Sequence, residues 1–100
     1  MPEPMIHRNT AVIWDVVNGA TTLCHTEKAE FFTVNHTRAA IWDVCEGRTV
    51  DQIVAEIRAR YPEADETRAA TLVRDYIDLL EKEGLVERRA DDSHRRRGGR

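Results

Sequence analysis

The chain has 100 residues, of which 41% are apolar and 33% are charged, and its formal net charge is −3. This length suits one domain with one hydrophobic core, and it leaves little room for a deep catalytic cavity beside that core. No apolar run approaches the ~20 residues of a membrane helix, and the first residues lack the pattern of a secretory signal. We therefore expect a cytoplasmic protein whose Cys24 and Cys45 are reduced core residues.

The charges divide the chain into parts. Residues 1–90 carry 11 Lys and Arg against 16 Asp and Glu, whereas residues 91–100 carry four Arg against two Asp. We expect a flexible lead-in over residues 1–9, which contains two prolines, and a folded domain over residues 10–88. Residues 89–100 are almost free of apolar side chains and should form a disordered basic tail.

Three strands are predicted first, over residues 10–17, 21–25 and 30–34. Asn18-Gly19, between the first two, is a strong signal for a tight turn that joins antiparallel strands. The third segment, EFFTV, alternates and is rich in aromatic and β-branched residues. These segments predict a three-stranded antiparallel meander whose third strand lies at an edge, with backbone groups available to another strand.

Three helices follow, over residues 37–45, 50–60 and 66–83. Each begins beside a side chain that can cap a helix, namely Asn35 or Thr37, then Thr49, then Asp65. Gly84 can adopt the left-handed conformation that ends the third helix, and Leu85-Val86 should pack back on the core as an extended piece. Strands followed by helices predict an α+β fold.

The third helix has a wider apolar arc than a minimal core stripe requires. A series that includes Tyr76 and Leu80 follows the three-and-four spacing of a buried face, and Leu72 and Leu79 lie to one side of it. Either all of these side chains pack in the core, or Leu72, Tyr76 and Leu79 line a groove beside the third strand. An apolar groove next to a free strand edge is what an extended peptide needs.

Catalytic and metal-binding patterns are weak. The candidate ligands or nucleophiles are Cys24, His25, His36 and Cys45, and their spacing matches no zinc pattern. A Cys–His nucleophile also needs an orienting third group and a cleft, and the five glycines form no phosphate-binding loop. We therefore expect no enzyme activity, no cofactor and no metal.

At several points the chain resembles the PqqD-like proteins, also called RiPP recognition elements. That family shows an aromatic pair before a Leu-Asn step, an Ile-Trp pair, an acidic-Gly turn, a Thr-Val helix start followed by Ile, and a terminal Gly-Leu-Val. The matching residues here are Phe31-Phe32, Val34-Asn35, Ile41-Trp42, Glu46-Gly47, Thr49-Val50 with Ile53, and Gly84-Leu85-Val86. Val34 replaces the commoner leucine, and the resemblance covers residues 10–88.

The resemblance implies a winged-helix-like fold of three antiparallel strands followed by three helices. It also implies a function, because family members bind the leader segment of a ribosomally made precursor peptide and present the core segment to a modifying enzyme. In the family the leader adds as a fourth strand against the third strand and packs on the third helix. Carried over by position, the peptide-binding residues are Glu30, Phe31, Phe32, Thr33 and Val34 on the strand and Leu72, Asp75, Tyr76 and Leu79 on the helix.

The chain looks most like the stand-alone leader-binding proteins of lasso-peptide pathways, whose partner is a separate leader protease. Recognition modules of radical enzymes and cyclodehydratases have similar sequences, so those partners remain alternatives. The free strand edge can also pair with a second copy, which leaves a homodimer open. Trp14 and Trp42 are both expected in the core. Trp42 lies beside the buried face of its helix and not on it, so a partly exposed position, where a partner enzyme would meet it, stays open as an alternative.

DNA binding is the competing function for a winged-helix-like fold. Residues 63–87, which contain the third helix and its margins, carry eight acidic residues against Arg68, Arg74 and Lys82. An acidic helix repels phosphate, so the electrostatic contribution to DNA binding is unfavourable. The sequence therefore predicts a peptide partner and no nucleic acid.

Overall fold

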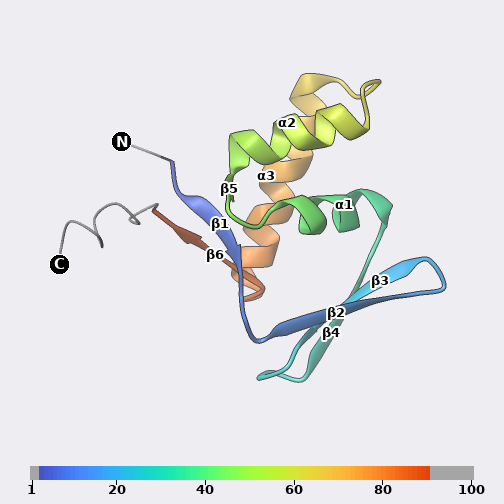
Figure 1. Cartoon of the computed structure of the whole chain (residues 1–100), viewed down its shortest axis with the longest axis vertical. Coiled ribbons are helices and arrows are strands. Elements are labelled where there is room, and N and C mark those ends of the chain that lie inside the picture. The colour runs from blue at the N-terminus through green and yellow to red at the C-terminus, as the bar shows by residue number, and fades with distance from the viewer. Residues whose placement is uncertain (1–2, 91–100) are drawn as a thin grey trace.

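The computed structural model describes residues 3–90. A three-stranded sheet lies at one end of the molecule, three helices lie on one side of it, and a second small sheet joins the two chain ends (Figure 1). In chain order the elements are β1 (Met5–Arg8), β2 (Val12–Val17), β3 (Ala20–His25), β4 (Glu30–Val34), α1 (His36–Val44), β5 (Arg48–Thr49), α2 (Val50–Arg60), α3 (Glu66–Lys82) and β6 (Val86–Arg89). The predicted α+β fold, with an antiparallel meander followed by three helices, is confirmed.

The meander has the strand order β2-β3-β4, and both pairings are antiparallel. Asn18 and Gly19 have φ values of 55° and 79°, as the mirror-image tight turn of a two-residue hairpin requires. Val17 pairs with Ala20 directly across this turn. The turn chemistry predicted from the sequence therefore sets the register of the whole sheet, and it leaves β4 at an edge.

The second sheet corrects the lead-in predicted for residues 1–9. Residues 5–8 form β1, which pairs with both β5 and β6 in the order β5-β1-β6. Ile6 is completely buried, so this short strand contributes to the core. The predicted tail needs a smaller correction, because Arg89 belongs to β6 and pairs with Met5, while residues 91–100 lie outside the described residues.

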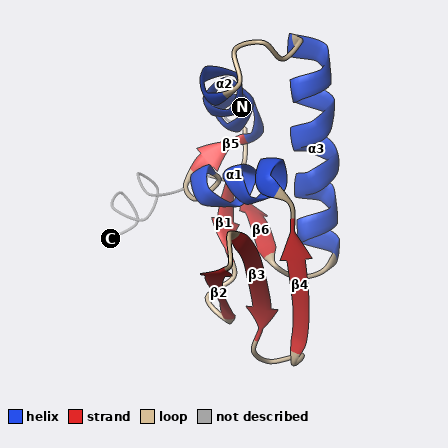
Figure 2. Cartoon of the chain, turned by 90° about the vertical axis from the view of Figure 1, so that its right-hand side faces the viewer, coloured by secondary structure: helices blue, strands red, loops and turns tan. Residues whose placement is uncertain are grey.

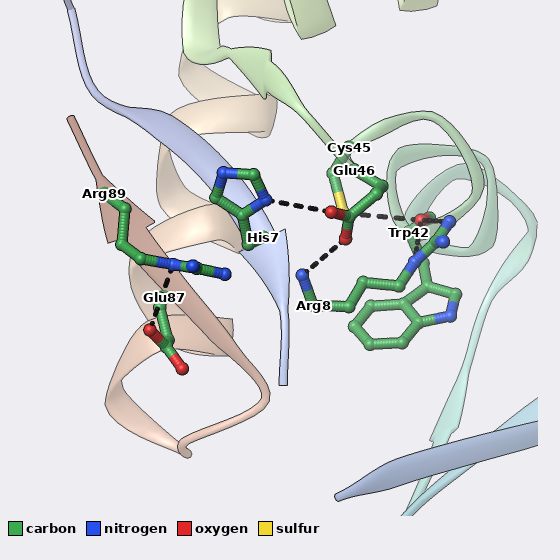
Figure 3. Close-up of polar contacts among 7 residues, drawn as sticks. All are labelled: His7, Arg8, Trp42, Cys45, Glu46, Glu87 and Arg89. Carbon is green, nitrogen blue, oxygen red and sulfur yellow. Dashed lines mark hydrogen bonds and ion pairs between the residues drawn. The ribbon is translucent and has the colours of Figure 1, made fainter. Parts of the chain in front are cut away.

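Polar contacts fix β1 against the end of α1 (Figure 3). Glu46 accepts hydrogen bonds from the Arg8 backbone N–H at 2.7 Å and from His7 Nδ1 at 2.9 Å. Partial burial alone would raise the pKa of the Glu46 carboxyl, but these two donors outweigh it and lower that pKa. The Arg8 guanidinium donates to the backbone carbonyls of Trp42 and Asp43, which satisfies the end of the helix.

The helices begin at the predicted capping residues. Asn35 Oδ1 accepts from the Arg38 backbone N–H at 2.9 Å, and Asp65 caps α3 through the same kind of bond to Arg68. Thr49 and Gln52 form a reciprocal capping box at the start of α2. Within residues 3–90, no helix combines the length and apolar character needed to cross a membrane.

The two tryptophans, both expected in the core, differ in burial. Trp42 is fully buried, whereas Trp14 is 43% exposed and meets Trp42 edge to face, with ring centroids 5.2 Å apart. The Arg8 guanidinium of β1 lies over both tryptophan rings, a contact that was not predicted from the sequence. Both cysteines are free as expected, but Cys45 is a core residue and Cys24, on β3, is only half-buried.

Candidate functional site

The hydrogen bonds of the sheet show which backbone groups β4 leaves open. Thr26, the residue after β3, donates its N–H to the Ala11 carbonyl at 2.8 Å, on the β2 side of the sheet. Backbone groups of successive strand residues alternate between the two neighbours. In β3, therefore, the backbone groups of Thr21, Leu23 and His25 face β4, in agreement with the hairpin closed by Val17 and Ala20.

The register of β3 with β4 then places the edge groups. Glu30, Phe32 and Val34 pair with the β3 residues whose backbone groups face β4. Phe31 and Thr33 consequently direct their N–H and C=O groups away from the sheet. No described strand lies on that side of β4, so these two residues form an open edge, which we call the β4 edge.

The C-terminal end of α3 lies beside the end of β4 that leads into α1, on the side away from β3 (Figure 2). Two contacts bracket β4 against the helix. Lys28, in the turn before β4, donates from Nζ to the Glu83 carbonyl at 3.1 Å, and the Arg38 guanidinium, just after β4, lies 5.0 Å from the Tyr76 ring centroid. These contacts hold the two ends of β4 next to the segment that runs from Tyr76, in the second half of α3, to Glu83, the residue that follows the helix.

Two leucines are exposed on α3: Leu79 lies within the segment bracketed by these contacts, and Leu72 lies further toward the start of the helix, where it lines a cavity with Thr37. Leu72 is 36% exposed and Leu79 is 37% exposed, and they lie one above the other, seven residues apart on the helix. Together we call them the leucine wall. Large apolar side chains that stay exposed beside an unpaired strand provide the two components of a peptide site, since one supplies backbone hydrogen bonds and the other apolar contact.

Tyr76 differs from its predicted place in the groove. Its side chain is only 3% exposed, its hydroxyl has no hydrogen-bond partner among the described residues, and burial raises its pKa to about 12. The helix is rotated so that Tyr76 lies in the core, under Arg38, while Leu72 and Leu79 lie at the boundary of the buried face. Tyr76 therefore lies in the core, behind the exposed leucines.

A cavity of about 750 Å³ continues the site beyond the end of β4. It lies where α1 begins, α2 ends and α3 starts. Its lining includes Leu72 and Asp75 from the predicted set, together with Thr37, Tyr61 and Arg68. A peptide that followed β4 toward α1 would reach this cavity. The candidate site therefore combines the β4 edge, the leucine wall and, at one end, the cavity.

The other predicted strand residues differ in exposure. Glu30 and Thr33 are exposed, Phe32 is half-buried, and Val34 is 8% exposed and belongs to the core. Sequence reasoning missed Arg38, because its contact with Tyr76 joins residues that are distant in the chain. The sequence showed only that Arg38 lies in the first turn of a predicted helix, and this position does not indicate which residue its side chain contacts.

The residues considered for catalysis do not form a cluster. Cys45 is fully buried, its thiol contacts the Trp42 carbonyl at 3.3 Å, and burial raises its pKa to about 11, which disfavours the reactive thiolate. His25 is 3% exposed, and its Nδ1 faces the Lys28 N–H at 3.4 Å. Across residues 3–90, no group of three or more His, Cys, Asp or Glu side chains is placed to hold a metal ion.

A small α+β domain with an open sheet edge beside an exposed apolar helix face has the architecture of a strand-binding module. The comparison with protein families is consistent with this class. Residues 20–86 match the family described as coenzyme PQQ synthesis protein D (PqqD). The chain belongs to the PqqD family, as its motifs predicted.

A solved structure has the same fold. The structure described as "TbiB1 in Complex with the TbiA(beta) Leader Peptide" is similar with a TM-score of 0.74 and 26% sequence identity, over 85% of this chain and 99% of that one. None of the curated proteins matches the chain.

Proposed function

We propose that this protein binds the leader segment of a ribosomally made precursor peptide by strand addition at the β4 edge. The observation that carries the proposal is the outward direction of the Phe31 and Thr33 backbone groups, next to the leucine wall. The likeness to a protein whose structure contains a leader peptide supports the same conclusion.

In this proposal the leader forms a fourth strand. Its backbone exchanges hydrogen bonds with Phe31 and Thr33, and the side chains that point inward contact Leu72 and Leu79. Glu30 lies at one end of the added strand, and Asp75 lies by the cavity at the other. Main-chain bonds give such binding its affinity, and the wall and cavity give it selectivity.

The bound leader is presented to a modifying enzyme, which we propose to be the leader protease of a lasso-peptide pathway. Binding at the edge holds the precursor by one segment and leaves the rest of the peptide accessible. If the protease binds the same complex, the encounter between protease and substrate becomes a local event at high effective concentration. The motif resemblance to stand-alone leader-binding proteins supports this partner.

Pairing between two copies of this chain would use the same backbone groups. A homodimer through β4 would bury the Phe31 and Thr33 edge groups of both copies, so self-pairing and leader binding exclude each other. The proposed function therefore requires leader to compete with any dimer, and a dimer formed this way should dissociate as leader is added.

The test first searches the genes next to the one for this chain for a short precursor peptide and a leader protease. The leader of that precursor, labelled with fluorescein, is then titrated in an anisotropy assay. Saturable binding is expected. A control leader with proline at every second central position cannot donate hydrogen bonds there and should not bind. Addition of the protein should then accelerate leader removal by the protease encoded nearby. Absence of saturable binding would overturn leader recognition, whereas binding without acceleration would overturn the protease assignment alone.

A further inference from the structure

The β2-β3-β4 sheet has two faces of different character. The face toward α1 carries buried side chains such as Leu23 and Val34. On the opposite, outer face, Ile13, Cys24 and Phe31 stand directly across from one another in the register. Ile13 is 60% exposed and Phe31 is 71% exposed, so this apolar row is open to solvent. We call these three residues the outer row.

The outer row is too small for a folded partner. A stable protein interface uses roughly 20–30 residues a side, whereas this row offers three side chains. The adjacent row across the sheet is polar, with Asp15, Thr22 and Thr33, and a flat partner would have to desolvate the Asp15 carboxylate. A second copy or a globular protein therefore fits this face poorly.

An added strand fits it well. The row ends at Phe31, on the β4 edge, and residues that face each other across neighbouring strands project from the same side of a sheet. A peptide paired with β4 would place one side chain on the outer face directly opposite Phe31. Because the Phe31 backbone groups face outward, this pair would be a hydrogen-bonded one, with Cβ atoms about 4.5–5.5 Å apart.

We propose that the leader carries an apolar side chain opposite Phe31 and that Phe31 is a specificity-determining residue on the outer face. The inference rests on the proposed strand addition. The neighbouring leader residue points to the inner face, where it meets the leucine wall. The protein would therefore recognise two adjacent apolar residues of the peptide, one on each face of the sheet. A peptide that simply alternates apolar and polar residues would place apolar side chains on one face only.

The test begins with a displayed library of random ten-residue peptides, selected against the protein. Selected peptides should contain an adjacent apolar pair, and Thr33→Pro, which removes an edge donor, should abolish their binding. One such peptide is then measured by anisotropy against Phe31→Thr and against Ile13→Thr. Both substitutions shorten the outer row at an exposed position, but only the first lies at the β4 edge.

We expect Phe31→Thr to weaken binding by roughly 3–10-fold, the range for an aromatic cross-strand pair, and Ile13→Thr to change it by less than about twofold. Changing the outward apolar residue of the peptide to threonine should remove the difference between wild type and Phe31→Thr. Additive losses, or equal losses for Phe31→Thr and Ile13→Thr, would overturn the role of Phe31 while leaving strand addition intact. Peptides that bind Thr33→Pro as well as wild type would overturn strand addition itself, and this inference with it.

Discussion

The two edges of the β2-β3-β4 sheet differ in how the chain treats their backbone groups. At the β2 edge the outward residues are Val12, Trp14 and Val16 by the same alternation that assigns the β4 edge. The Val12 N–H is bound to the Asn9 carbonyl at 3.0 Å, and the Val16 N–H is bound to Asp15 Oδ1 at 2.8 Å. Two of the three outward N–H groups of the β2 edge are therefore bound by the chain's own groups.

The β4 edge has no such protection among the described residues. Phe31 and Thr33 both keep their outward groups unpaired, and exposed leucines lie beside them. Soluble proteins usually block exposed strand edges, because these edges pair with other chains. The difference between the two edges supports the proposal that the β4 edge is kept open for a binding partner.

The largest effect should come from a proline at the open edge. Thr33→Pro removes the outward N–H and leaves a leader carbonyl unpaired, so we expect binding to weaken at least about 30-fold in an anisotropy titration. Val16→Pro is the matched control, since it makes the same change at the β2 edge and should leave the affinity near wild type. Equal losses for the two variants would show that the edges do not differ.

The leucine wall should give the next largest effect. Leu79→Ala and Leu72→Ala each remove partly exposed apolar surface that a bound leader would cover, so each should cost about 1–2 kcal/mol of binding free energy. Leu79→Met retains the apolar contact and should bind like wild type. Isothermal titration calorimetry provides the measurement, and wild-type affinity in both alanine variants would mean that α3 does not contact the peptide.

Opening the blocked edge should create self-association. Asp15→Thr releases the Val16 N–H and removes a carboxylate from the β2 edge, so in a Thr33→Pro background we expect self-association to tighten about tenfold. Sedimentation velocity at several protein concentrations measures this. Asp15→Asn keeps an acceptor oxygen and should behave like the parent, whereas an unchanged Asp15→Thr would show that this side chain does not guard the edge.

The smallest effect on binding is expected behind the open edge, at Tyr76. Its hydroxyl is buried without a partner, so Tyr76→Phe should leave leader affinity within about twofold and the free energy of unfolding equal or higher at neutral pH. A large loss of affinity in this variant would show that Tyr76 belongs to the binding surface.

The same variant should change the response to alkali. Burial raises the pKa of Tyr76 from 10.0 to about 12, so folding favours the neutral phenol. This contribution to stability is complete below about pH 10 and is lost as pH rises toward 12, because the unfolded chain ionises first. Urea unfolding between pH 8 and 11 should therefore show a shallower decline for Tyr76→Phe, with the remaining slope including Cys45, whose pKa is raised to about 11.

Features that depend on neighbouring residues were predictable from the sequence. The capping residues Thr49 and Asp65 act within three positions along the chain, and the Asn18-Gly19 turn acts within four. Strand β4 was predicted with its observed bounds for the same reason, because alternation is a local pattern.

Features that depend on distant residues were not predictable. Strand β1 is four residues long, and its partner β6 lies at the other end of the chain, with Met5 opposite Arg89. Arg8 of β1 lies over both tryptophan rings, so the contact between this strand and the tryptophans was missed as well, and so was the exposure of Trp14. Spacing places Tyr76 next to the leucines on the helix, but the rotation of α3 that buries it depends on packing against α2 and β6, which lie elsewhere in the chain.

Amide hydrogen exchange, followed by NMR at Glu30 through Val34, tests the open edge most directly. In the free protein the amides of Phe31 and Thr33 should exchange rapidly, whereas those of Phe32 and Val34 should be protected by β3. Addition of a library-selected peptide should protect Phe31 and Thr33 and leave the other amides nearly unchanged. Protection of Phe31 and Thr33 before any peptide is added, or no gain of protection when peptide binds, would contradict the account.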